Sequence, residues 1–237
     1  KAWCQKFNLP TFTLSQINTW VTQKNVIDFD LMTNIAKKNR TILKDALIIN
    51  PFKSVEKCPA ADLSATKYIF QIEPHVFIEA VAIQEKGYET LCISSQAGCP
   101  VDCKFCLTGV SGLKKNLTVQ EIVAQIAIIK SYGHHITHVV FMGMGEPLLN
   151  LKSVIPSLDW LQSDWGFNLS KRHITVSTSG YLAGIEQLIK EGIHLRLIIR
   201  IHLFFIKFDR IRNTASPFEI RLISNFKIYR ITIYFSY

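Results

Sequence analysis

The sequence QAGCPVDCKFC, residues 96–106, contains three cysteines in the spacing Cys-x3-Cys-x2-Cys. Thiolates are the usual ligands of iron–sulfur clusters, and spacings this short let a single loop surround one cluster. Three cysteines leave one iron of a [4Fe-4S] cluster without a protein ligand, and an open metal position can bind a substrate or a chelating cofactor. We therefore predict that Cys99, Cys103 and Cys106 hold a [4Fe-4S] cluster.

A structural zinc site is the main alternative for this cysteine loop. Zinc usually takes four ligands, often from two paired knuckles, and the sequence has no second cysteine pair. His134, His135 and His138 lie further along the chain and could supply a fourth ligand. Three thiols without any metal are a further alternative, which their position directly after a predicted strand disfavours.

Hydrophobic spacing around the loop indicates an α/β fold. Residues 1–45 have apolar residues at helical spacing, and residues 66–95 contain three runs typical of strands, with Gly87 in the turn between the last two. After the loop, helices and short apolar strands alternate as far as residue 201, which is typical of parallel βα units. One of these helices is expected to begin at Thr118, whose spacing to Glu121 matches a capping box.

The composition is that of a globular protein without a membrane-spanning helix. Hydrophobic residues make up 48% of the 237 residues, and no uncharged apolar run reaches the roughly 18 residues that a membrane span needs. Three of the six cysteines crowd into one loop, whereas a disulfide framework spreads its cysteines along the chain. This pattern favours a reducing, cytoplasmic location. Residues 1–5 show neither an initiator Met nor a signal-peptide pattern, so we interpret the start as a fragment boundary or a trimmed end.

The last part of the chain differs in composition from the rest. Residues 195–237 contain eight Lys or Arg and two Asp or Glu, and so carry six of the nine net positive charges. A strongly basic chain usually suggests nucleic-acid binding, but this uneven distribution weakens that inference. The same segment lacks Gly and Val, and ten Ile lie between Ile198 and Ile233. We interpret it either as a β-rich terminal domain or as the translation of a wrong reading frame or of non-coding AT-rich sequence.

Two further motifs follow predicted strands. In FMGMGEPLLN, residues 141–150, Gly145 lets the backbone approach a ligand closely, and Glu146 is placed to accept hydrogen bonds from an ammonium group or hydroxyls. In HITVSTSG, residues 173–180, Ser177 lies at the end of the next strand. Each motif has a structural alternative, since the first could be only a turn and Ser177 could bond to its own backbone.

Together these motifs resemble a known family. A Cys-x3-Cys-x2-Cys loop after a strand is similar to the radical SAM superfamily, in which S-adenosylmethionine (SAM) binds the open iron. The longer strings at residues 91–99, 143–150 and 169–180 resemble the RlmN-type RNA methyltransferases, which are similar in activity to the Cfr resistance enzymes. Trp20 and residues 28–33 resemble the small helical accessory domain of that family.

The resemblance covers about residues 1–202. It implies an α/β fold in which residues 1–72 form an accessory domain, helical and then strands. Residues 73–202 are expected to form a partial radical SAM (β/α) barrel, and residues 203–237 an aberrant tail without family resemblance.

The resemblance also implies the activity and its residues. The family methylates carbon 2 of adenosine in 23S rRNA and tRNA, using a [4Fe-4S] cluster, SAM, and an electron donor such as flavodoxin, with no membrane partner. It assigns SAM contacts to Gly145, Glu146, Ser177 and His202, and it adds a disulfide bond without fixing its partners. Glu79 takes the position of the proton acceptor, although on sequence alone it would be a polar residue in an edge strand.

The sequence departs from the family pattern after residue 199. Arg200 stands where the family has Ser, and no cysteine follows Cys106, although the family carries the transferred methyl group on a cysteine near its carboxyl end. We therefore expect that this chain, interpreted as truncated and frameshifted, does not complete methyl transfer. A non-catalytic RNA-binding remnant and another radical SAM enzyme are the alternatives.

Overall fold

The computed structural model describes residues 2–101, 103, 106–193, 195–202, 218–224 and 227–236, of which residues 200–202 and those after 217 are described by their backbone alone. His202 ends strand β9, but its side chain lies outside the described part. Residues 203–217 of the expected tail lie outside it as well.

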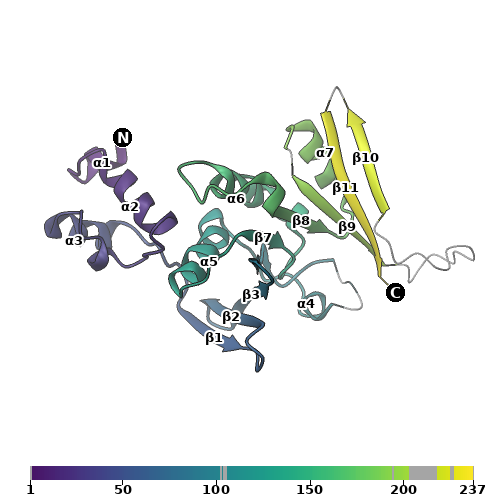
Figure 1. The fold of residues 1–237 in the computed structure, drawn as a ribbon, viewed down its shortest axis with the longest axis horizontal. Coiled ribbons are helices and arrows are strands. Elements are labelled where there is room, and N and C mark those ends of the chain that lie inside the picture. Colours follow the sequence, from purple (N-terminus) through teal and green to yellow (C-terminus); the bar gives the residue numbers. More distant parts are fainter. Residues whose placement is uncertain are drawn as a thin grey trace, which may run out of the picture.

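One large sheet organises the described part of the chain (Figure 1). Its order is β1-β2-β3-β4-β7-β8-β9-β11-β10. The strands are β1 (Ser54–Pro59), β2 (Ala65–Glu73), β3 (Val76–Glu85), β4 (Tyr88–Cys92), β7 (His138–Phe141), β8 (Ile174–Thr178), β9 (Arg196–His202), β10 (Phe218–Ser224) and β11 (Lys227–Ser236). Strands β1 to β4 pair antiparallel, whereas β4, β7, β8, β9 and β11 run parallel.

Helices connect the parallel strands, as the alternating pattern predicts. These are α5 (Val119–Ser131), α6 (Leu151–Gln162) and α7 (Leu182–Lys190), with the 3-10 turns η2 (Pro147–Asn150) and η3 (Lys171–His173). Thr118 and Glu121 form the predicted capping box at the start of α5. The predicted α/β class is confirmed, and the sheet stays open within the described residues, as expected for a partial barrel.

The amino-terminal helices form a separate unit beside the sheet (Figure 1). They are α1 (Ala2–Lys6), α2 (Thr13–Thr22), η1 (Phe29–Leu31) and α3 (Lys37–Ala46). Their apolar residues, among them Ile17, Met32 and Leu43, form one buried cluster, and residues 52–197 form a second. Val21 packs against both clusters and so joins the two units.

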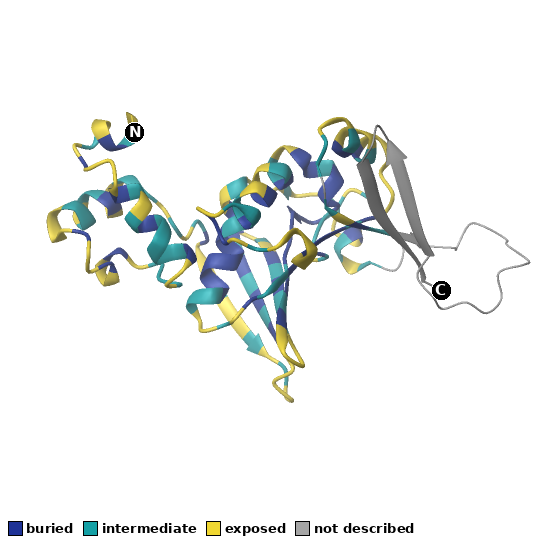
Figure 2. Ribbon diagram, turned by 45° about the horizontal axis from the view of Figure 1, so that its top comes forward, coloured by how far each residue is buried: buried dark blue, intermediate teal, exposed yellow. Residues whose placement is uncertain are grey.

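Burial is deepest in the sheet and in the helices that cover it (Figure 2). Strand β1, by contrast, has no buried residue. The sequence did not indicate β1, because a strand without a buried face has no regular apolar alternation to detect. None of the described helices is long and apolar enough to cross a membrane.

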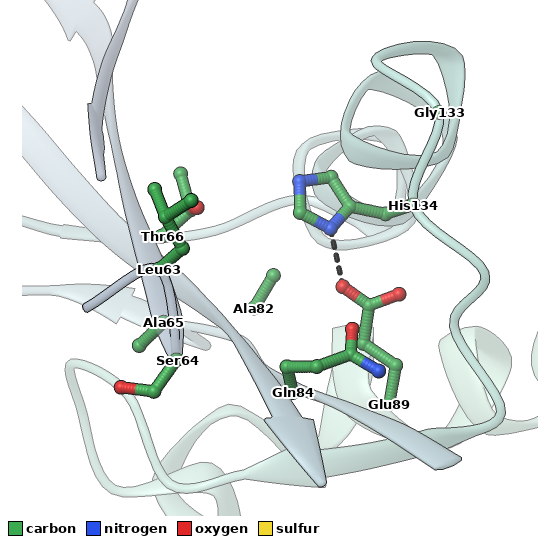
Figure 3. Close-up of a pocket in the computed structure, with 9 residues that line it drawn as sticks. All are labelled: Leu63, Ser64, Ala65, Thr66, Ala82, Gln84, Glu89, Gly133 and His134. Atoms are coloured by element: carbon green, nitrogen blue, oxygen red, sulfur yellow. Dashed lines mark hydrogen bonds and ion pairs between the residues drawn. The ribbon is translucent and has the colours of Figure 1, made fainter. Parts of the chain in front are cut away.

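A contact between Glu89 and His134 links the amino end of β4 to the loop before β7 (Figure 3). The Glu89 carboxylate bonds to Nδ1 of His134 and accepts the backbone N–H of His135 at 2.8 Å. Nε2 of His134 lies 2.7 Å from the hydroxyl of Tyr68 on β2, a side chain with no exposed surface. These contacts tie β2, β4 and the α5–β7 loop together, and they involve two of the three histidines considered as zinc ligands.

Candidate functional site

The structure brings six of the predicted site residues to one cavity of about 140 Å³. The cavity lies at the carboxyl ends of β7 and β8, between these strand ends and the cysteine loop. Its lining includes Cys99, Cys103, Cys106, Gly145, Glu146 and Ser177. Three segments that are far apart in the sequence therefore meet at the strand edge where ligands bind in open α/β sheets.

The cysteine loop runs from β5 (Gln96–Ala97) to the short helix α4 (Leu107–Val110), and its described backbone forms hydrogen bonds within the loop and to the residue Gly112 after α4. The Cys99 N–H donates to the Gly112 carbonyl at 3.2 Å, and the Cys106 N–H donates to the Cys103 carbonyl at 2.9 Å. None of the six cysteines, all of which the structure describes, takes part in a disulfide bond.

Electrostatics around the loop suit a cationic group. Burial raises the pKa of the Cys99 thiol, and the negative charges of Glu146, Cys103 and Cys106 raise it further. A thiolate here needs a positive partner, which the irons of a cluster supply. The donor set and its charge therefore fit a [4Fe-4S] cluster with an open position.

The zinc alternative fits less well. The described residues that line the cavity include no histidine, and His134 bonds instead to Glu89 and Tyr68. His138 begins β7, whereas the cavity lies at its other end, and its ring packs 4.2 Å from that of His173.

The segment Ile93–Gln96, which leads into the cysteine loop, holds the segment Gly143–Glu146 in place. Gly143 N–H donates to the Ile93 carbonyl at 3.0 Å, and the Met144 carbonyl accepts from the N–H groups of Ser95 and Gln96 at 2.9 and 3.2 Å. The Glu146 N–H donates to Oε1 of Gln96 at 2.8 Å. The base of the cysteine loop and the Gly-Glu-Pro segment are thus parts of one hydrogen-bonded unit.

This close approach requires glycine at two positions. A Cβ on Gly143 would lie 2.7 Å from the Ile93 carbonyl oxygen, and one on Gly145 would lie 2.7 Å from the Gln96 nitrogen. Gly145 also has a φ of +100°, which other residues rarely adopt. The two glycines therefore allow close packing against the protein's own segment Ile93–Gln96, and the predicted approach of Gly145 to a ligand stays a prediction.

The Glu146 carboxylate is almost completely buried, with 4% of the residue exposed. Its Oε1 accepts the Leu148 N–H at 3.1 Å, and its Oε2 accepts the N–H and hydroxyl of Ser179 at 2.8 and 2.9 Å. Glu146 therefore links the β7–α6 connection to the end of β8, two residues beyond Ser177. The sequence did not single out Ser179, although its place after Ser177 in a strand-end Ser/Thr run is a local signal.

Glu79 lies outside the cavity lining, on β3. Its carboxylate is half-exposed and pairs with the ammonium group of Lys67 on β2 at 3.2 Å. Its backbone carbonyl accepts the hydroxyl of Ser94 at 2.5 Å, which joins β3 to the segment leading to the cysteines.

Comparisons with known proteins agree with this geometry. The family model of the radical SAM superfamily matches residues 93–224, which include the cysteine loop and most of the parallel strands. The chain belongs to the radical SAM superfamily. A second model, the N-terminal domain of ribosomal RNA large subunit methyltransferases, matches residues 1–49.

Curated relatives of this superfamily member include RlmN-type methyltransferases, as the sequence predicted. It is 41% identical over 219 residues to the dual-specificity RNA methyltransferase RlmN of Dichelobacter nodosus, covering 89% of this chain and 58% of the relative. It is 40% identical over 190 residues to the probable enzyme of that name from Aquifex aeolicus, covering 79% of this chain and 54% of the relative. The chain therefore spans a little over half the length of these relatives.

A solved structure shares the fold. The radical SAM methyltransferase from Sphaerobacter thermophilus is 32% identical, with a TM-score of 0.78, and the match covers 84% of this chain and 60% of that one. The radical SAM fold is confirmed. The accessory-domain match at residues 1–49 disfavours a radical SAM enzyme of an unrelated kind.

Proposed function

We propose that this chain is part of an RlmN-type RNA methyltransferase that methylates carbon 2 of adenosine in 23S rRNA and tRNA. The observation that carries the proposal is the single cavity lined by the three cysteines together with Gly145, Glu146 and Ser177. The proposed setting is the cytoplasm, with a flavodoxin-like protein as electron donor. The proposed units are residues 1–72, 73–202 and 203–237, and the first boundary falls at the end of β2, which pairs with β3.

Each cavity residue has a proposed task in binding. Cys99, Cys103 and Cys106 would bind three irons of a [4Fe-4S] cluster, leaving the fourth to SAM. When bound and reduced, this cluster supplies the electron that cleaves SAM into methionine and a carbon-centred radical. Gly145 and Glu146 would accept hydrogen bonds from SAM through their backbone carbonyl oxygens, because the Glu146 carboxylate is already held by Leu148 and Ser179 and its N–H by Gln96. Ser177 offers a hydroxyl from β8, and His202 is proposed as a further contact.

Glu79 is proposed to take the proton that leaves carbon 2 of the adenine. A general base must come within hydrogen-bond reach of the proton that it removes. In this structure one oxygen of Glu79 faces Lys67, and the half-exposed carboxylate keeps its other oxygen for a substrate. Carbon 2 of adenine is not nucleophilic, so it cannot attack the methyl group of SAM in an ordinary substitution reaction. A radical reaction does not need a nucleophilic carbon.

The family resemblance routes the methyl group through a cysteine near the carboxyl end, and no cysteine follows Cys106 here. SAM cleavage does not need that cysteine, so it is the activity by which the proposal is tested.

The decisive experiment is anaerobic reconstitution with iron and sulfide, followed by SAM and dithionite. We expect a brown protein that releases 5′-deoxyadenosine, and loss of both iron and product in Cys99→Ala, Cys103→Ala and Cys106→Ala. Cys58→Ser is the matched control, because Cys58 lies on β1, outside the cavity, and should leave both readouts unchanged. Bound zinc without SAM cleavage would overturn the proposal and leave a structural module or an RNA-binding remnant.

A further inference from the structure

Ser94 lies where three parts of the proposed site meet. It has no exposed surface, and its hydroxyl makes two hydrogen bonds at once. The hydroxyl donates to the carbonyl of Glu79 at 2.5 Å and accepts the N–H of Met144 at 2.8 Å. One hydroxyl has one proton and two acceptor positions, so this arrangement uses its only proton. The partners lie 15 and 50 positions away in the sequence.

The backbone of Ser94 is itself fixed from the helix side of the sheet. Gln125 on α5, also without exposed surface, accepts the Ser94 N–H at 2.9 Å and donates to the Ser94 carbonyl at 3.0 Å. The Ser94 side chain therefore extends from a backbone that is fixed independently of its two hydroxyl partners. Such locked support is what holds a site in a precise geometry.

The segment Gly143–Glu146 packs closely against the Ser94 hydroxyl. A Cβ on Gly143 would lie 2.8 Å from the Ser94 hydroxyl oxygen and 2.7 Å from the Ile93 carbonyl oxygen. The segment Gly143–Glu146 thus packs as close to Ser94 as a backbone without a side chain allows. The hydrogen bond from the Met144 N–H to the Ser94 hydroxyl holds the backbone next to Gly145 in this close position.

We propose that Ser94 is a positioning residue that couples the proton-acceptor strand to the SAM-binding segment. Its hydroxyl sets the separation between Glu79 on β3 and the backbone at Met144–Gly145. Ser94 touches neither substrate nor cluster in this role, and it acts through the residues that do. The inference rests on the proposed function insofar as Glu79 and Gly145 have the roles given above.

The sequence offers a matched control in the next residue. Ser95 is similarly buried, with 1% exposed, but its hydroxyl has no hydrogen-bond partner among the described residues. Ser94→Ala and Ser95→Ala delete the same atom from adjacent buried positions, but only Ser94→Ala deletes hydrogen bonds made by that atom. Any difference between the two variants therefore reports on the Ser94 hydroxyl.

Two measurements on the 237-residue chain test the proposal. Hydrogen exchange of the apo protein, followed on a peptide containing Met144, should be faster in Ser94→Ala than in the wild type and unchanged in Ser95→Ala. After anaerobic reconstitution, SAM affinity from the change in the cluster's EPR spectrum should fall about tenfold in Ser94→Ala, which corresponds to about 1.4 kcal/mol. Iron content should stay the same in all three proteins.

The outcomes separate this inference from the proposed function. Equal exchange and equal SAM affinity in Ser94→Ala and Ser95→Ala would overturn the role of Ser94, even if the wild type cleaves SAM. A wild type that binds no SAM would overturn the proposed function, while the exchange data would still test the coupling. If Ser94→Ala does not fold, Ser94→Cys takes its place, because cysteine is similar in size and its thiol is a weaker hydrogen-bond donor. Hydrogen exchange at Met144 that is faster than in the wild type but slower than in an unprotected peptide supports the coupling. Exchange at the wild-type rate contradicts it.

Discussion

At the scale of single residues, the site depends on buried polar groups that are paired with one another. Ser94, Gln96, Gln125, Glu146 and Asn150 are all buried, and each has a hydrogen-bond partner from another segment. A buried polar group without a partner costs more free energy than the hydrogen bond itself contributes. Substitutions here should therefore affect both stability and ligand binding.

Glu146→Gln tests this expectation. The amide keeps one acceptor oxygen but places N–H donors where the carboxylate now accepts from Leu148 or Ser179. We expect a loss of roughly 1–3 kcal/mol in unfolding free energy, measured by urea denaturation of the apo chain, together with weaker SAM binding. Ser179→Ala should lower the unfolding free energy by less than Glu146→Gln does, because the Ser179 N–H still bonds to Glu146. Equal stability of Glu146→Gln and wild type would show that the carboxylate network is not needed.

At the scale of secondary-structure elements, the Tyr68–His134–Glu89 contact joins β2, β4 and the α5–β7 loop. Burial raises the pKa of Tyr68 from 10.0 to about 12, and the charges of Tyr132 and Glu89 add to the effect. Between these two pH values the unfolded chain releases the phenol proton while the folded chain keeps it. The contribution of Tyr68 to stability is therefore complete below pH 10 and falls as the pH rises toward 12.

Tyr68→Phe isolates that contribution. At pH 8 the variant should be less stable than wild type by roughly 1–3 kcal/mol, since Nε2 of the partly buried His134 loses its partner. Between pH 10 and 12 the gap should narrow, because only the wild type carries the titrating phenol. Urea unfolding of both proteins at pH 8 and pH 11 gives the difference, and a gap that stays constant with pH would contradict the assignment.

Regular elements could be predicted from the sequence because their signals are local. The capping box of Thr118 and Glu121, the hairpin at Gly87 and the alternation after residue 118 all depend on neighbours within a few positions. The residues that complete the site could not be predicted in this way. Ser94 and Ser179 act through partners 15 to 50 positions away, and short polar side chains in a strand end look alike whether or not they have such partners.

At the scale of the whole molecule, the amino-terminal unit is more basic than the sheet region that follows it. Residues 1–49 contain seven Lys or Arg and three Asp, whereas residues 50–194 contain twelve basic and thirteen acidic residues. Helix α3 alone carries Lys37, Lys38, Arg40 and Lys44. If the proposed RNA substrate contacts this unit, its affinity will depend on salt through these side chains.

The double variant Lys37→Gln/Lys38→Gln should weaken tRNA binding uniformly across sequences. The slope of log affinity against log salt is negative, and each phosphate contact that the variant no longer makes should reduce its magnitude by about 0.7–0.9. Filter binding or fluorescence anisotropy at several salt concentrations measures this slope. Lys86→Gln, in the exposed turn between β3 and β4, is the control and should leave the slope unchanged. An unchanged slope in the double variant would place the RNA contact elsewhere.

The pairing of Ile93–Gln96 with Gly143–Glu146 has a consequence for protein engineering. Grafting only the three-cysteine loop onto another scaffold would leave its base without the partner segment that shapes it, since these segments share hydrogen bonds through Ile93, Ser94, Ser95 and Gln96. A transplant that carries both segments, with their two glycines, would keep the proposed cluster-binding loop and the proposed SAM-binding segment in their mutual arrangement.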